Sequence, residues 1–196
     1  MAVFGPGTDY QNAPRYFSAL LEAQMATSPD GILVADSQRN LLAWNQRFLD
    51  MWSLSPEIMD AGDSSAAVAA VLAQVADPEG FRRRIEELYE ALDEPENGVE
   101  VTLRDGRVLE RYSRGMRDEA GGYWGRCWFY RDITQRKQAQ TALQLSEQRF
   151  RAVFDRAALG IMVVNRHGEV RMMNPALERM MEIGRASCRE RVYTKV

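Results

Sequence analysis

Very few side chains in this sequence are suited to nucleophilic catalysis or to metal binding. The chain has one histidine, His167, and two cysteines, Cys127 and Cys188. Nucleophilic triads that need a histidine have only His167 to use, and a protein zinc site needs several His or Cys ligands at close spacing. His167 stands beside Gly168 in a turn-like segment, where a polar residue needs no special role. We therefore expect no catalytic residue and no metal site.

Carboxylates offer the remaining acid or base chemistry. In a small stand-alone enzyme, Asp36, Glu100 or Glu110 would act as the acid or base. No catalytic motif surrounds these residues, and acidic side chains are typical of the polar face of a strand. An enzyme is therefore the weaker hypothesis.

The composition is that of an ordinary globular domain. The 196 residues are 45% hydrophobic and 27% charged, with a net charge of -3, which excludes wholesale disorder, a collagen and a coiled-coil rod. The longest apolar run, residues 66–73, is far shorter than the roughly 20 residues of a membrane-spanning helix, and the N-terminus lacks a signal-peptide pattern. The acidic balance argues against nucleic acid as a partner. We expect a cytoplasmic protein with no membrane segment in this chain.

The sequence repeats itself at one fixed offset of 129 residues. In each copy a short apolar run, a turn and a second apolar run predict a hairpin, and an asparagine then precedes a helix. Asn45 and Asn174 are therefore predicted to be helix N-caps, the second strengthened by Pro175 at the first helical position. The identities on which the repeat depends place Gly31, Ile32, Val34, Asn45 and Met51 on Gly160, Ile161, Val163, Asn174 and Met180.

The segment between the two copies completes a larger fold. Pro56 and Pro78 follow capping residues and mark two further helix starts, and apolar residues recur at helical spacing over residues 81–92. Strand patterns follow at residues 99–103, 108–114 and 123–130. Two strands, a block of helices and three strands predict an α+β fold with a five-stranded antiparallel sheet.

Four stretches stand in an order that is more specific than any one of them. They are Pro29-Asp30-Gly31-Ile32-Leu33-Val34-Ala35-Asp36, Trp44-Asn45, Leu103-Arg104-Asp105-Gly106-Arg107 and Trp128-Phe129-Tyr130-Arg131-Asp132-Ile133-Thr134. In this order they resemble the PAS sensor family. The resemblance implies a PAS fold whose sheet cups a small-molecule pocket, a homodimer formed through flanking helices, and an output domain that this chain lacks. It also implies that Asp132, Ile133 and Thr134, at the exit of the last strand, relay the signal.

The resemblance also separates the chain from two cofactor-binding subfamilies. Light-sensing flavin members carry a reactive cysteine in an Asn-Cys-Arg-Phe-Leu-Gln run on a core helix, and no such run stands between Asn45 and Leu92. Haem members ligate iron through a histidine, and the first unit has none. We expect neither a covalent flavin site nor a His-ligated haem there, and Cys127 is expected to be a buried, inert thiol.

The cofactor itself stays unassigned. Aromatic side chains are candidates for the pocket wall, but at strand spacing they are equally typical of a plain core. These candidates are Trp44, Tyr112, Trp124, Trp128 and Phe129.

The resemblance gives the domain organisation. We expect a flexible N-terminus at residues 1–14, a PAS domain at 15–133, a linker helix at 134–155 and the truncated start of a second PAS domain at 156–181. The linker spacing suits a short coiled coil and a simple packing helix equally, and the resemblance favours a signalling helix. The output implied is a histidine kinase or a cyclic-di-GMP cyclase or phosphodiesterase. A pure interaction domain without a ligand is the alternative.

The last segment, residues 182–196, continues neither copy of the repeat. Back-translated, it fits the read-through of a common sequencing adapter. We expect a non-native tail there.

Overall fold

The computed structural model describes residues 13–60 and 64–181. The expected tail at residues 182–196, and all but the last two residues of the expected flexible N-terminus, lie outside the described residues. The chain divides after residue 137 into two compact units, and each is described by itself.

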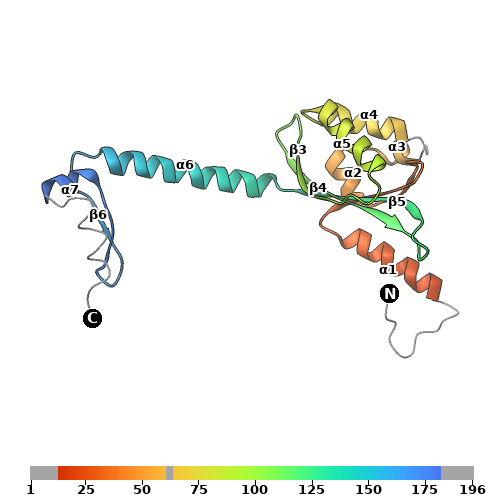
Figure 1. The fold of residues 1–196 in the computed structure, drawn as a ribbon, viewed down its shortest axis with the longest axis horizontal. Coiled ribbons are helices and arrows are strands. Elements are labelled where there is room, and N and C mark those ends of the chain that lie inside the picture. The colour runs from red at the N-terminus through yellow and green to blue at the C-terminus, as the bar shows by residue number, and fades with distance from the viewer. Residues whose placement is uncertain (1–12, 61–63, 182–196) are drawn as a thin grey trace. The chain divides into compact units, whose positions relative to one another are not determined.

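The first unit is built on a five-stranded antiparallel sheet (Figure 1). The strands lie side by side in the order β2-β1-β5-β4-β3, so that the first and last strands of the sheet pair at its centre. Their bounds are β1 (Gly31–Asp36), β2 (Leu41–Trp44), β3 (Glu96–Thr102), β4 (Val108–Arg117) and β5 (Tyr123–Asp132). This sheet, with its inserted helices, confirms the predicted α+β fold class.

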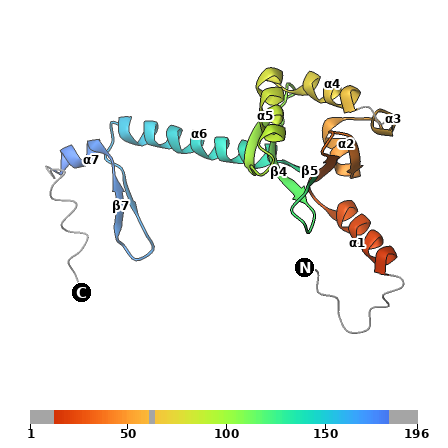
Figure 2. The same cartoon turned by 45° about the vertical axis from the view of Figure 1, so that its right-hand side comes forward.

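Four helices inserted between β2 and β3 gather on one side of the sheet (Figures 1 and 2). They are α2 (Gln46–Trp52), α3 (Pro56–Asp60), α4 (Ser64–Gln74) and α5 (Pro78–Glu90). The preceding helix, α1 (Ala13–Thr27), lies on the opposite side. The hydrophobic core therefore forms between the sheet and the inserted block.

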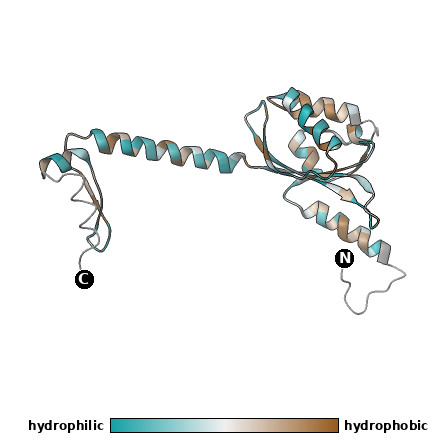
Figure 3. Ribbon diagram, viewed as in Figure 1, coloured by the Kyte–Doolittle hydropathy of each residue, from teal (hydrophilic) through white to brown (hydrophobic). Residues whose placement is uncertain are grey.

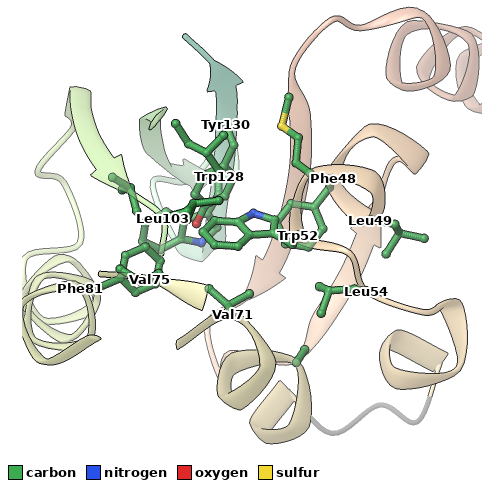
Figure 4. Packing of buried hydrophobic residues seen from close by; sticks show 14 of the residues in the cluster. Phe48, Leu49, Trp52, Leu54, Val71, Val75, Phe81, Leu103, Trp128 and Tyr130 are labelled. Atoms are coloured by element: carbon green, nitrogen blue, oxygen red, sulfur yellow. The ribbon is translucent and has the colours of Figure 1, made fainter. Parts of the chain in front are cut away.

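Aromatic packing is centred on Trp52, which is fully buried (Figure 4). Its ring lies 6.5 Å from that of Phe48, 6.1 Å from that of Phe81 and 5.3 Å from that of Tyr130, measured between centroids. These three partners come from α2, α5 and β5. One side chain thus joins two of the inserted helices to the sheet.

Two strands differ from their predicted bounds. β3 begins at Glu96, earlier than predicted, because Glu96 is drawn into the interior by a buried ion pair with Arg111. A register shift between Glu96 and Val99, with Gly98 at a φ of 66°, joins this first residue to the regular ladder. β4 runs on to Arg117, beyond the predicted end at residue 114, because it stays paired with β5.

The second unit continues α6 (Thr134–Arg156) into a hairpin and a short helix. The hairpin pairs β6 (Met162–Val164) with β7 (Val170–Met173), and α7 (Pro175–Met180) follows it. Over residues 13–60 and 64–181, no helix is both long and apolar enough to span a membrane.

Asn45 joins three elements of the first unit through its side-chain amide. Its Oδ1 accepts hydrogen bonds from the backbone N–H of Ile32 at 2.8 Å and of Phe48 at 2.9 Å. Its Nδ2 donates to the carbonyls of Met25 and Asp30, each at 2.9 Å. The end of α1, the start of β1 and the N-terminus of α2 are thereby fixed together.

Asn174 makes the same four bonds in the second unit. Its Oδ1 accepts from Ile161 at 2.8 Å and from Leu177 at 3.0 Å. Its Nδ2 donates to the carbonyls of Phe154 at 3.0 Å and of Leu159 at 2.8 Å. Every partner stands at the offset of 129 residues that relates the two copies.

Replacing this amide destabilises the first unit. Asn45→Ala removes four hydrogen bonds from a buried site, and we expect the free energy of unfolding to fall by about 2–4 kcal/mol. Urea unfolding followed by circular dichroism measures the change. The matched control is Gln46→Ala, which removes one exposed bond to Asp50 and stays within about 0.5 kcal/mol of the parent. Equal stability of the two variants would contradict the role given to Asn45.

Candidate functional site

A cavity of about 280 Å³ lies between the inner face of the sheet and the inserted helices. This volume lies just below the roughly 300–1,000 Å³ range typical of small-molecule sites. Its interior is apolar and aromatic, with Leu33 from β1, Phe48 from α2, Val71 from α4 and Ile85 from α5. A wall of this kind favours an apolar guest.

Strand alternation explains how β5 contributes to the cavity. Trp128 and Tyr130 are buried and line it, whereas Cys127 and Phe129, the alternate residues, are only partly buried and do not line it. Tyr89 of α5 packs against Trp128 with ring centroids 6.0 Å apart. The strand that ends at α6 therefore forms part of the cavity wall.

Charged side chains stand at the mouth of the cavity. Arg39, Arg82 and Glu86 line it and are exposed. The Arg39 guanidinium lies over the Tyr89 ring, 4.6 Å from its centroid. Arg82 lies 3.9 Å from Glu79 on the same helix.

A layer of buried charge lies behind the aromatic wall. Arg111 pairs with Glu96 through two hydrogen bonds, one of them Nη2 to Oε1 at 3.0 Å, and both side chains are at most 1% exposed. The Arg111 guanidinium lies 4.7 Å from the ring centroid of Phe81 and 5.6 Å from that of Trp128. These contacts connect the buried ion pair to two residues of the wall.

Arg126 lies in the same buried layer and, among the described residues, has no carboxylate partner. Its guanidinium donates to the carbonyls of Leu88 at 2.7 Å and Leu92 at 3.1 Å, and to the hydroxyl of Ser113 at 2.7 Å. The carbonyls belong to the C-terminal end of α5 and the segment after it, where helix carbonyls lack helical partners. Arg126 thereby attaches α5 to the sheet.

The two phenols of the wall stay protonated at neutral pH. Burial raises the pKa of Tyr130 to about 12. Burial also raises the pKa of Tyr89. Both hydroxyls thus remain neutral hydrogen-bonding groups beside the cavity.

Among the aromatic candidates from the sequence, only Trp128 lines the cavity. Trp124 is 67% exposed, and Trp44 packs against the core outside the cavity. Tyr112 and Phe129 pair with one another on the outer face of the sheet. The prediction that these four candidates line the cavity is wrong. Strand alternation places Tyr112 and Phe129 on the outer face, and a register shift exposes Trp124. Trp44 shares the inner face with its partner Leu33 but lies outside the cavity.

Sequence reasoning missed most of the aromatic wall. Phe48, Phe81 and Tyr89 lie on inserted helices, and Tyr130 lies on β5. The helical spacing of Phe81 and Tyr89 marked a buried face, but spacing alone does not show that this face borders a cavity. Arg39 gave no local signal either, since it stands in an exposed turn.

The cavity lining includes none of the candidate nucleophiles and carboxylates that the structure describes. Burial raises the pKa of the Cys127 thiol to about 11, so the thiol is protonated at neutral pH. Asp36 accepts two backbone bonds in the turn after β1, and the hydrogen bond from the Asn40 side chain lowers its pKa. The backbone N–H of His167 donates to Asn165 in the equivalent turn of the second unit.

Glu110 and Glu100 lie on the outer face of the sheet and bind the first turn of α6. Arg136 donates to Glu110 at 3.0 Å, and Lys137 pairs with Glu100. Burial acts to raise the pKa of Glu110, but hydrogen bonds from Arg136 and Tyr112 outweigh it and lower the pKa overall. Both carboxylates thus serve as anchors for the helix.

The residues at the exit of β5 join the sheet to α6. Ile133 is 3% exposed, and its N–H donates to the Val108 carbonyl at 2.9 Å. The Val108 N–H donates in turn to Thr134 Oγ1 at 3.0 Å. Asp132 Oδ1 accepts from the Thr134 N–H at 2.9 Å. The start of α6 is therefore fixed to β4 by side-chain and backbone bonds together.

A family model described as the PAS fold matches residues 25–141, which is more than half of the chain. The chain belongs to the PAS family. A second model, described as a PAS domain, matches residues 148–193. This second match covers the hairpin of the second unit and enters the segment expected to be a non-native tail, whose origin stays a prediction.

Solved PAS structures are similar to the chain at low identity. The PAS domain of BvgS from Bordetella pertussis is 21% identical, with a TM-score of 0.49 over 68% of this chain and 98% of that one. The PAS domain of an HTR-like protein from Haloarcula marismortui is 23% identical, with a TM-score of 0.45 over 63% and 97%. No curated protein matches the sequence.

Proposed function

We propose that the first PAS unit senses a small apolar molecule in its cavity and passes the signal through Asp132, Ile133 and Thr134 to α6. The single observation that supports this most is the position of β5. Trp128 and Tyr130 on this strand line the cavity, and two residues later the strand reaches Asp132. A guest that shifts either ring displaces the strand that holds α6.

The output lies outside this chain in our proposal. It is a histidine kinase or a cyclic-di-GMP cyclase or phosphodiesterase. We propose that the unit lies in the cytoplasm, because the nucleotide substrates of these enzymes are there. In this proposal the chain itself is not an enzyme. The contacts that Asp36, Glu100 and Glu110 make outside the cavity support this view. Turnover of a simple ester or phosphate substrate by the purified chain would contradict the last point, and the downstream reading frame decides the output.

We also propose that the protein is a homodimer formed through its flanking helices. Phe17, Leu20 and Leu21 share one side of α1 and are 43%, 53% and 46% exposed, and Figure 3 shows the hydrophobic colouring along this helix. On α6, Leu143 and Val153 are 70% and 71% exposed. Large apolar side chains gathered on one helix favour burial against a partner.

A guest in the cavity stabilises the first unit. We expect 1-octanol, at about ten times its Kd, to stabilise the protein by about 1.4 kcal/mol and to raise the unfolding temperature by roughly 3–6 °C. Differential scanning fluorimetry measures the shift. Val71→Phe, or the smaller change Ala67→Leu, fills the cavity and abolishes the shift, because both residues line it. Val99→Phe, on an exposed site outside it, keeps the shift. An equal octanol effect in the filled and control variants would disprove binding in the cavity.

The relay depends on the cap that Asp132 forms. With octanol bound, we expect slower hydrogen exchange in the first two turns of α6, and Asp132→Ala removes this difference because the Thr134 N–H loses its acceptor. Hydrogen exchange read by mass spectrometry measures the effect. Asp105→Ala, which removes an equivalent cap in the turn after β3, leaves the difference intact. A ligand-dependent difference that survives in Asp132→Ala would exclude the relay.

The dimer depends on the apolar side of α1. Sedimentation equilibrium of the unmodified chain is expected to give about twice its mass of 22.3 kDa. Leu20→Glu places a charge on the apolar side and shifts the protein to monomer. Ala19→Glu adds the same charge at an exposed position on the opposite side of the helix and keeps the dimer. A monomeric parent chain would refute the proposal.

A further inference from the structure

Arg39 occupies a backbone position that favours glycine. Its φ is 71°, and the residue at the equivalent position of the second unit is Gly168, with a φ of 79°. The two turns share their bonding, since the Arg39 N–H donates to the Asp36 carbonyl at 3.1 Å and the Gly168 N–H to the Asn165 carbonyl at 3.0 Å. A side chain in this left-handed region raises the free energy of the turn. The turn itself thus gives no reason for an arginine.

The arginine side chain reaches the cavity mouth. Its guanidinium stacks on Tyr89, and the residue lines the cavity. Over residues 13–60 and 64–181, no carboxylate forms an ion pair with Arg39. A guanidinium that stacks on a ring keeps its N–H donors directed outward in its own plane, available to a planar anion. The mouth thus carries a positive group with unused donors.

Charges around the cavity favour an anion over a cation. Within the described part of the chain, the buried charged side chains are Arg111, Arg126 and Glu96, a surplus of one positive charge behind the aromatic wall. Among these described residues, Arg111 Nη1 finds no hydrogen-bond partner. At the mouth, Arg82 is paired with Glu79, and among the described residues Arg39 and Glu86 form no ion pair. In an apolar environment, the surplus buried positive charge attracts a negative group more strongly than it would in water.

We propose that the cavity binds an amphiphilic carboxylate, with its apolar tail among the aromatic side chains and its carboxylate on Arg39. This rests on the proposed function of the cavity as a ligand site, and it adds the chemical class of the ligand. A volume of about 280 Å³ equals that of about nine liquid waters, which is room for a guest of about ten non-hydrogen atoms. Octanoate has this size. 1-Octanol and octylamine have the same number of carbons, but the first is uncharged and the second is positively charged at neutral pH.

The experiment compares these three probes on the full chain by isothermal titration calorimetry at neutral pH. We expect octanoate to bind about tenfold more tightly than octanol, because its carboxylate forms a charge-assisted bidentate pair with Arg39. We expect octylamine to bind more weakly than octanol. Equal affinities for octanoate and octanol would overturn this inference and leave the proposed function standing. Failure of all three probes to bind would overturn both.

Substitutions at Arg39 test the site directly. Arg39→Gly installs the residue that the second unit carries, relieves the left-handed strain and removes the charge, so the variant is expected to fold at least as well as the parent. Its affinity for octanoate falls about tenfold while its affinity for octanol stays within about twofold. Arg83→Ala, on the exposed side of α5 and away from the cavity, leaves both affinities unchanged. An equal loss for octanoate and octanol in Arg39→Gly would mean that Arg39 only packs on Tyr89, and the assignment would be wrong.

Discussion

The amide of Asn45 is the interaction on which the arrangement of the first unit depends. It accepts hydrogen bonds from the backbone N–H groups of Ile32 and Phe48. It also donates hydrogen bonds to the backbone carbonyls of Met25 and Asp30. Among the natural side chains only an amide offers two acceptor lone pairs and two donors at this length. Because the bonds fix where α2 begins, they also fix which side of α2 faces the sheet. The core between helix and sheet, and the cavity beside it, follow from that choice.

Buried charge sets the other boundary of the cavity. Arg126 binds the carbonyls at the end of α5, where the helix dipole is negative, and so places that helix against β5. Arg111 supports the wall rings Phe81 and Trp128 from behind, while Glu96 balances its charge. Burial of unpaired charge is costly, so this layer tolerates little movement. The cavity is therefore shaped by fixed charges as much as by apolar packing.

The sequence predicted the elements of the first unit better than the wall of its cavity. Hairpins and caps are local, so periodicity and Asn45 sufficed to predict β1, β2 and the start of α2. The wall depends on strand register, which is not local. Trp124 illustrates this, because β4 pairs Met116 with Gly125 and Arg117 with Tyr123, which leaves Trp124 as the extra residue of a bulge. Regular alternation along the strand, counted back from the buried Trp128, would place Trp124 on the buried face. Trp124 is instead exposed.

The second copy of the repeat separates what the fold requires from what is particular to the first unit. Asn174 repeats every bond of Asn45 even though, in the residues described, β6 pairs only with β7. The asparagine, the hairpin and the following helix thus form without the rest of a sheet, as a local unit of structure. The two copies differ at the turn of the hairpin. Arg39 holds a left-handed backbone conformation there that is strained for an arginine, whereas Gly168 adopts it without strain. A residue that the shared geometry disfavours, and that lines the cavity of the first unit, fits the proposed role in ligand recognition better than a role in folding.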